Sequence, residues 1–74
     1  MGANEDLEAA AQLFDLAADE LEQAVAHCRT AAAHVRASDV PRGAAHAWAA
    51  WGHLDLAVER LRGQARVHAV KSNP

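Results

Sequence analysis

The chain has 74 residues, a mass of 7.9 kDa and a formal net charge of -3. A chain of this length forms one small domain, and such a domain buries only about 60% of its unfolded surface. Twenty residues are alanine, the strongest helix former, whereas glycine (4), proline (2) and aromatic residues (4%) are scarce. The composition therefore excludes a second domain and a β-rich fold, and it predicts an all-α protein.

The first predicted helix covers residues 4–37 and begins at Asn4, a residue type that commonly caps helices. Its apolar residues follow one another at alternating steps of three and four, the spacing of a coiled-coil seam. They are Leu7, Ala11, Phe14, Ala18, Leu21, Val25, Cys28, Ala32 and Val35.

A turn is predicted at residues 38–42, because Pro41 disfavours helix at Val40 and because Ser38 or Asp39 can cap a new helix. The second helix is predicted over residues 43–70, with a tail at 71–74. A second seam runs through Ala44, Ala47, Trp51, Leu54, Val58, Leu61, Ala65 and His68. The short connection predicts an antiparallel two-helix hairpin.

The larger seam residues are expected to hold the two helices of one copy together. They are Phe14, Leu21, Val25, Trp51, Leu54, Val58 and Leu61. Beside them runs a flank of small residues that permits close approach of the helix axes: Ala10, Ala17, Ala24, Ala31, Gly43, Ala50, Ala57 and Gln64. Charge order agrees with the hairpin, since folding places Arg62 between Asp15 and Glu22, and Arg29 between Trp48 and Asp55.

Four large apolar residues lie off the seam and are expected to form an intermolecular interface: Leu13, Leu16, Trp48 and Leu56. A hairpin has one seam, so this surface needs another partner. Self-association of two hairpins into a four-helix bundle is the simplest solution, because twofold dimers are the commonest oligomers. A hairpin completed by a different protein and a lone monomer are the alternatives.

Four of the five histidines share one side of the predicted helices: His27, His34, His46 and His53. Folding about residue 40 sets His34 beside His46 and His27 beside His53. A pair of imidazoles, joined by its symmetry mate or by Glu20, could bind Zn, Ni or Cu. The alternatives are histidines at a polar edge of the helix interface, and a pH-sensitive switch.

The segment Arg29-Thr30-Ala31-Ala32-Ala33-His34 resembles the R-x4-H pattern of HEPN-type helical ribonucleases. The resemblance covers six residues. It implies that Arg29 stabilises phosphate charge and that His34 acts as acid or base in RNA cleavage. Thr30 stands where that family usually has Asn, Asp or His, and two further helices of that fold have no counterpart in this chain.

The single cysteine, Cys28, lies within the first seam and is expected to be a buried structural residue. The lack of cysteine pairs and of a basic, apolar leader favours a reducing cytoplasm. No apolar stretch reaches the length of a membrane span, and no basic face marks a nucleic-acid binder. The sequence thus predicts a non-enzymatic helical interaction or assembly module that acts as a homodimer without a cofactor. A metal-binding bundle and an RNA-acting protein are the alternatives.

Overall fold

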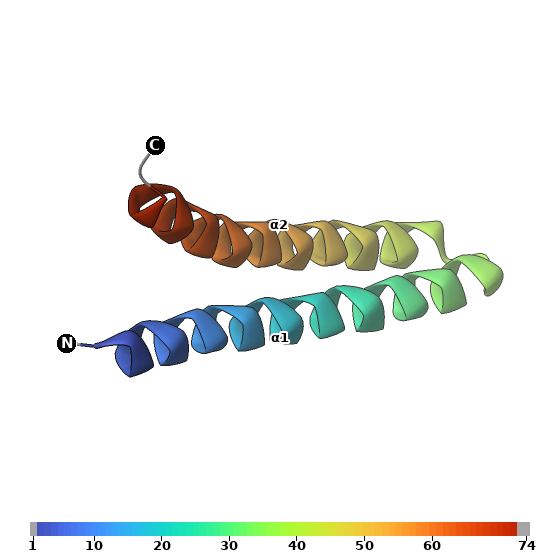
Figure 1. The fold of residues 1–74 in the computed structure, drawn as a ribbon. Coiled ribbons are helices and arrows are strands. Elements are labelled where there is room, and N and C mark those ends of the chain that lie inside the picture. The colour runs from blue at the N-terminus through green and yellow to red at the C-terminus, as the bar shows by residue number, and fades with distance from the viewer. Residues whose placement is uncertain (1, 73–74) are drawn as a thin grey trace.

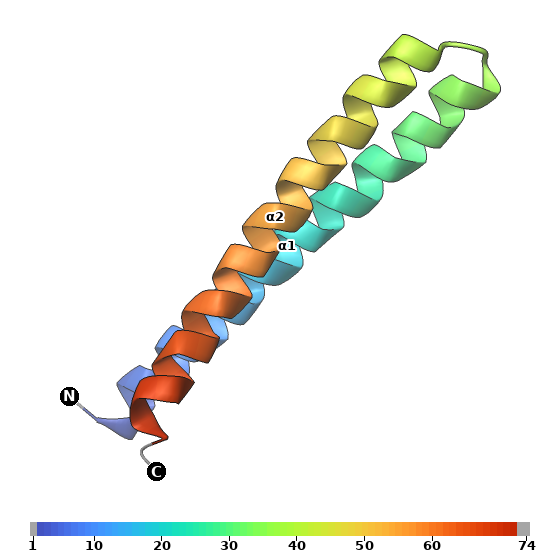
Figure 2. The same ribbon diagram turned by 90° about the horizontal axis from the view of Figure 1, so that it is seen from above.

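The computed structural model describes residues 2–72 and consists of two long helices. Helix α1 spans Ala3–Arg36 and helix α2 spans Val40–Lys71. The helices run antiparallel and side by side, so the start of α1 and the end of α2 lie at the same end of the hairpin (Figures 1 and 2). The hairpin measures 54 × 23 × 12 Å. The prediction of an all-α antiparallel hairpin is confirmed.

The helix ends differ from the predicted ones by up to three residues. Helix α1 is capped by Gly2, so Asn4 lies inside the helix and the prediction that it is the cap was wrong. Helix α2 begins at Val40, because the Asp39 carboxylate accepts a hydrogen bond from the Arg42 N–H at 3.3 Å. Proline is tolerated in the first turn of a helix, where its missing N–H has no partner in any case. Of the predicted tail, Asn73 and Pro74 lie outside the described residues.

The connection between the helices is a three-residue Schellman motif. The Ser38 N–H donates to the Val35 carbonyl at 2.9 Å, and the Asp39 N–H donates to the His34 carbonyl at 2.8 Å. Ser38 has a φ of 63°, in the left-handed region that glycine usually occupies at this position. The turn therefore satisfies the last carbonyl groups of α1 without any additional residues.

The two helices meet along small residues. The buried apolar side chains among the described residues are Ala17, Ala50 and Ala57, which are 3%, 6% and 1% exposed, and Gly43 is buried beside them. All four belong to the flank of small residues that was predicted to permit close approach. This flank is the contact line of the hairpin.

The predicted seam is not the buried contact line between the helices. Phe14, Leu21, Val25, Trp51, Leu54 and Leu61 are exposed, and Val58 is only half-buried. Cys28 is exposed as well, so its predicted burial was also wrong. Both stripes follow the seven-residue repeat of the helices, but only the stripe of small residues lets two backbones approach closely.

Gly43 shows how close the approach is next to the turn. A Cβ atom at this position would lie 2.6 Å from Val35 Cγ2 and 3.1 Å from the Ala31 carbonyl oxygen. Both distances are shorter than ordinary Cβ contacts, so an alanine at residue 43 would require the Val35 side chain and the facing backbone to shift.

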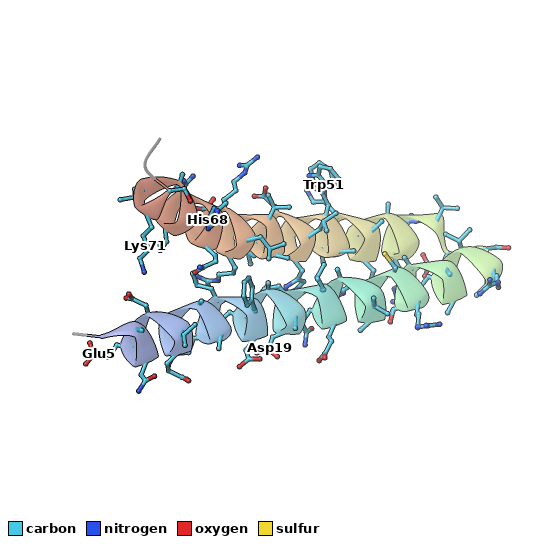
Figure 3. The ribbon with its side chains drawn as sticks, in the orientation of Figure 1. Glu5, Asp19, Trp51, His68 and Lys71 are labelled. Carbon is cyan, nitrogen blue, oxygen red and sulfur yellow. The ribbon has the colours of Figure 1, made fainter. Side chains whose placement is uncertain are left out.

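Ion pairing also departs from the predicted charge order. The pairs recorded within residues 2–72 include one between the far ends of the helices, Lys71 Nζ to Asp6 Oδ2 at 2.8 Å. Figure 3 shows Lys71 extending toward α1. Among the ion pairs within residues 2–72, none joins Arg62 to Asp15, and both residues are exposed. Both residues lie on the outer side of their helices, away from the contact line.

Candidate functional site: a histidine ladder and an apolar face

Four imidazole rings follow one another in a row that we call the histidine ladder: His34, His46, His27 and His53. The two outer contacts are stacked, and the central contact between His27 and His46 is tilted by 30°. Ring centroids are 5.3 Å apart at each of the three steps, from His34 to His46, from His46 to His27 and from His27 to His53. The rings alternate between α1 and α2. The predicted pairing of His34 with His46 and of His27 with His53 is confirmed.

Hydrogen bonds link the ladder across the hairpin. His27 Nδ1 lies 3.0 Å from His46 Nδ1, and His53 Nδ1 lies 2.8 Å from Glu20 Oε2. The first contact requires one ring to donate its N–H and the other to accept on a bare nitrogen, so at least one of these two imidazoles is neutral. The second joins a ring nitrogen to a carboxylate that, with a side chain 23% exposed, is largely shielded from solvent.

The positions of the ring nitrogens in the ladder show which histidines could bind one metal ion together. The Nδ1 atoms of His27 and His46 are the two ring nitrogens that converge, and they come from different helices. Within residues 2–72 no group of three or more His, Cys, Asp or Glu side chains is placed to hold one ion. The hairpin by itself therefore offers two converging imidazole ligands, with His34 and His53 stacked outside them.

Arg29 and His34, the residues of the R-x4-H pattern, lie on different sides of α1. His34 is half-buried and stacks on His46, whereas Arg29 is exposed on the outer side of the helix. The role in RNA cleavage that the resemblance implies for this pair stays a prediction.

The large residues of the predicted seam, together with Val40, form an exposed surface that we call the apolar face. Fourteen large apolar side chains within the described residues are exposed, and nine of them belong to this face. Its members are Leu7, Phe14, Leu21, Val25, Val35, Val40, Trp51, Leu54 and Leu61, together with the half-buried Val58.

Helix geometry places these side chains on the same side of the hairpin. Each residue is rotated by about 100° from the one before it. Phe14 and Leu21 therefore lie about 40–60° to one side of Ala17, and Leu54 and Leu61 lie equally far, in the same sense of rotation, from Ala57. Because the helices are antiparallel, the same sense of rotation leads to the same face.

The middle of the apolar face is hollowed. A shallow depression there is lined by Trp51, Leu54, Asp55 and Val58. Figure 3 shows the Trp51 side chain projecting away from α1, and its side chain is 65% exposed. An indole beside a hollow on an exposed surface is the kind of feature that anchors protein interfaces.

The four residues predicted to form the intermolecular interface lie on three different sides. Leu13 is half-buried and approaches Gly63 of the other helix. Leu16 and Leu56 are exposed on the side opposite the apolar face, and Trp48 is 79% exposed on the outer side of α2. No contact with a second chain tests their assignment, which stays a prediction.

Charged residues border the apolar face on the outer side of α1, about 140–160° around the helix from the contact line. We call this row the charged edge. It changes sign along the helix, from three acids to two bases: Glu8, Asp15, Glu22, Arg29 and Arg36. The matching positions of α2 are Trp48, Asp55 and Arg62.

Comparisons with known proteins give no match to this chain, whether with protein-family profiles, with curated protein sequences or with solved structures. A search of the described helices finds no stretch that is both long enough and apolar enough to cross a membrane.

Proposed function

We propose that this protein is a non-enzymatic interaction module whose hairpins pair through their apolar faces into a four-helix bundle. A small regulatory or adaptor protein of this kind acts by presenting the assembled bundle. The observation that carries the proposal is that the large apolar side chains remain exposed, whereas the fully buried side chains are alanines.

Surface area supports a partner on this face. The hairpin has an accessible surface of 5689 Å². A compact monomer of the same mass exposes about 4,400 Å². The difference of about 1,300 Å² exceeds the roughly 800 Å² that each partner buries in a stable protein interface. Covering the apolar face would therefore bring the chain to the surface of an ordinary folded protein.

A second copy is the partner that these features favour. Each hairpin presents two antiparallel apolar stripes, and a second hairpin supplies two stripes of the same length. Helical interfaces that are shared by identical subunits resemble a domain core divided in half. The apolar face has this character, because it holds Phe14, Leu21, Leu54 and Leu61 where a single-copy core has only alanine.

Light scattering and sedimentation across a range of concentrations test the proposal. The wild-type chain is expected at twice its 7.9 kDa mass. The Phe14→Glu/Leu54→Glu variant places two carboxylates on the apolar face and is expected to be monomeric. A wild-type protein that stays monomeric at all concentrations contradicts the proposal.

The Leu16→Glu/Leu56→Glu variant is the matched control. It makes the same chemical change once on each helix, at side chains that are 42% and 44% exposed, but on the opposite side of the hairpin. This variant is expected to remain dimeric. If it dissociates while the Phe14→Glu/Leu54→Glu variant stays dimeric, the interface lies on the side that Leu16 and Leu56 occupy.

Metal binding is a second candidate function, and the convergence of His27 Nδ1 and His46 Nδ1 at 3.0 Å favours it. A Zn, Ni or Cu ion bound there would replace the proton that the two rings share. Native mass spectrometry of freshly purified protein, repeated after chelation and after addition of equimolar Zn²⁺, tests this function. His27→Gln is expected to abolish binding, and His68→Gln, outside the ladder, is the control. Wild-type protein that takes up no ion would exclude the site.

A further inference from the structure

The order of charges along the charged edge favours one way of docking two hairpins over another. The sign of the edge changes at the middle, with Glu8, Asp15 and Glu22 toward the start of α1 and Arg29 and Arg36 toward its end. The spacing is seven residues throughout, so the five side chains form one straight row beside the apolar face. A row of this kind is complementary to a reversed copy of itself.

Two hairpins can pack their apolar faces together in two symmetric ways. A twofold axis perpendicular to the helices places α1 against α1 of the second copy and α2 against α2. A twofold axis parallel to the helices places α1 against α2 of the second copy. Neighbouring helices are antiparallel in both arrangements, so apolar packing alone does not choose between them.

The perpendicular axis pairs opposite charges along the charged edge. With Glu22 next to the axis, Glu8 lies beside Arg36 of the second copy and Asp15 lies beside its Arg29. The symmetric contacts give four attractive pairs in the dimer. Glu22 and Asp55 each meet their own symmetry mates, which gives two repulsive pairs.

The parallel axis pairs the charges less well. Contacts within the hairpin show which residues of α1 and α2 lie at the same height along the helix axes: Asp6 contacts Lys71, and Glu20 contacts His53. With this alignment Asp15 lies beside Arg62 of the second copy, and Glu22 lies beside its Asp55. The dimer then has two attractive and two repulsive pairs, two attractive pairs fewer than the other arrangement.

We propose that the hairpins dock with α1 against α1 of the second copy, in reversed direction, and that the charged edge selects this arrangement. The inference rests on the proposed self-association and adds the arrangement of its interface. Charged residues at the rim of an interface mainly decide orientation and specificity, while the apolar centre supplies affinity. The charged edge lies at such a rim.

Cysteine cross-linking in a Cys28→Ser background tests the arrangement. Glu22→Cys lies next to its own symmetry mate, so a short bis-maleimide is expected to join most chains into covalent dimers. Asp15→Cys is the matched control on the same edge: it is not expected to join its own mate, but it is expected to join Arg29→Cys when the two variants are mixed. The opposite arrangement predicts that Glu22→Cys joins Asp55→Cys instead.

Charge exchange provides a test that needs no linker. The Glu8→Arg/Asp15→Arg variant has bases at every position of the charged edge except Glu22, and the Arg29→Glu/Arg36→Glu variant has acids at every position. The four attractive pairs become repulsive in each variant, so each is expected to dimerise at least tenfold more weakly than wild type. Mixed in equal amounts, they are expected to form a heterodimer close to wild-type affinity. Arg62→Glu is the control, because Arg62 faces no acidic residue of the second copy in the proposed arrangement.

The outcomes separate the two proposals. A wild-type protein that is monomeric in light scattering refutes self-association and the arrangement with it. A dimer that links Glu22→Cys to Asp55→Cys, or in which mixing does not restore affinity, refutes the arrangement alone. A dimer that links Glu22→Cys to itself and recovers on mixing supports both.

Discussion

Glycine-to-alanine substitutions at two positions of α2 are expected to change stability in different ways. Alanine in a helix interior is favoured over glycine by about 1 kcal/mol. At Gly52 no atom of another residue lies within 4 Å of the added Cβ, so the Gly52→Ala variant keeps this gain. At Gly43 the added Cβ would lie 2.6 Å from Val35 Cγ2 and 3.1 Å from the Ala31 carbonyl oxygen.

The size of the difference follows from these contacts. Inserting an extra carbon into a tightly packed site costs about 1–3 kcal/mol. Set against the helix gain of about 1 kcal/mol, the Gly43→Ala variant is expected to range from unchanged to about 2 kcal/mol less stable. It should therefore lie about 1–3 kcal/mol below Gly52→Ala, which corresponds to at least about 4 °C in melting temperature for a domain of this size.

Urea and thermal unfolding followed by helical circular dichroism measure this difference. All variants are compared at one protein concentration, because association makes apparent stability concentration-dependent. Adding Val35→Ala to Gly43→Ala removes the nearest atom and is expected to recover part of the loss. If Gly43→Ala is as stable as Gly52→Ala, the helices do not approach as closely as the contact line of small residues requires.

Three further substitutions test other parts of the hairpin. Ala57→Leu introduces a large side chain at a position that is 1% exposed and should lower stability by about 1–3 kcal/mol, whereas Ala26→Leu on the exposed side should change it little; equal unfolding midpoints would argue against the contact line. Ser38→Gly relieves the positive φ of the turn and should raise the free energy of unfolding by about 1 kcal/mol, and a loss of stability in urea would contradict this account. His27→Ala removes a ring that stacks on two others and should cost about 1–3 kcal/mol in urea unfolding, against less than about 0.5 kcal/mol for exposed His68→Ala; similar effects of both would deny the ladder a role in holding the helices.

Local signals in the sequence predicted the helices and their connection. Alanine content and the regular apolar spacing predicted two helices, and Asp39 followed by Pro41 predicted the start of the second to within three residues. These signals act within a few residues of the chain, through capping hydrogen bonds and restricted backbone angles. They depend little on the rest of the fold.

The pairing of the histidines could also be predicted from the sequence. His27, His34, His46 and His53 are spaced by multiples of the helical repeat on both sides of one turn, so any antiparallel hairpin folded near residue 40 brings them together. The hydrogen bond between His27 and His46 was not predicted. It forms because His27 lies between His46 and His53 along the hairpin, and the spacing of histidines in the sequence does not give this offset between the two helices.

The sequence by itself determined two antiparallel helices and the row of imidazoles between them. Only the tertiary structure decided whether the seam or the neighbouring stripe of small residues forms the contact line. A three-residue turn holds the two helices so close together at Gly43 that an added Cβ would press on Val35, and the buried side chains farther along are alanines. Phe14, Trp51 and Leu54 are too large for this space, so they lie on the exposed face of the hairpin.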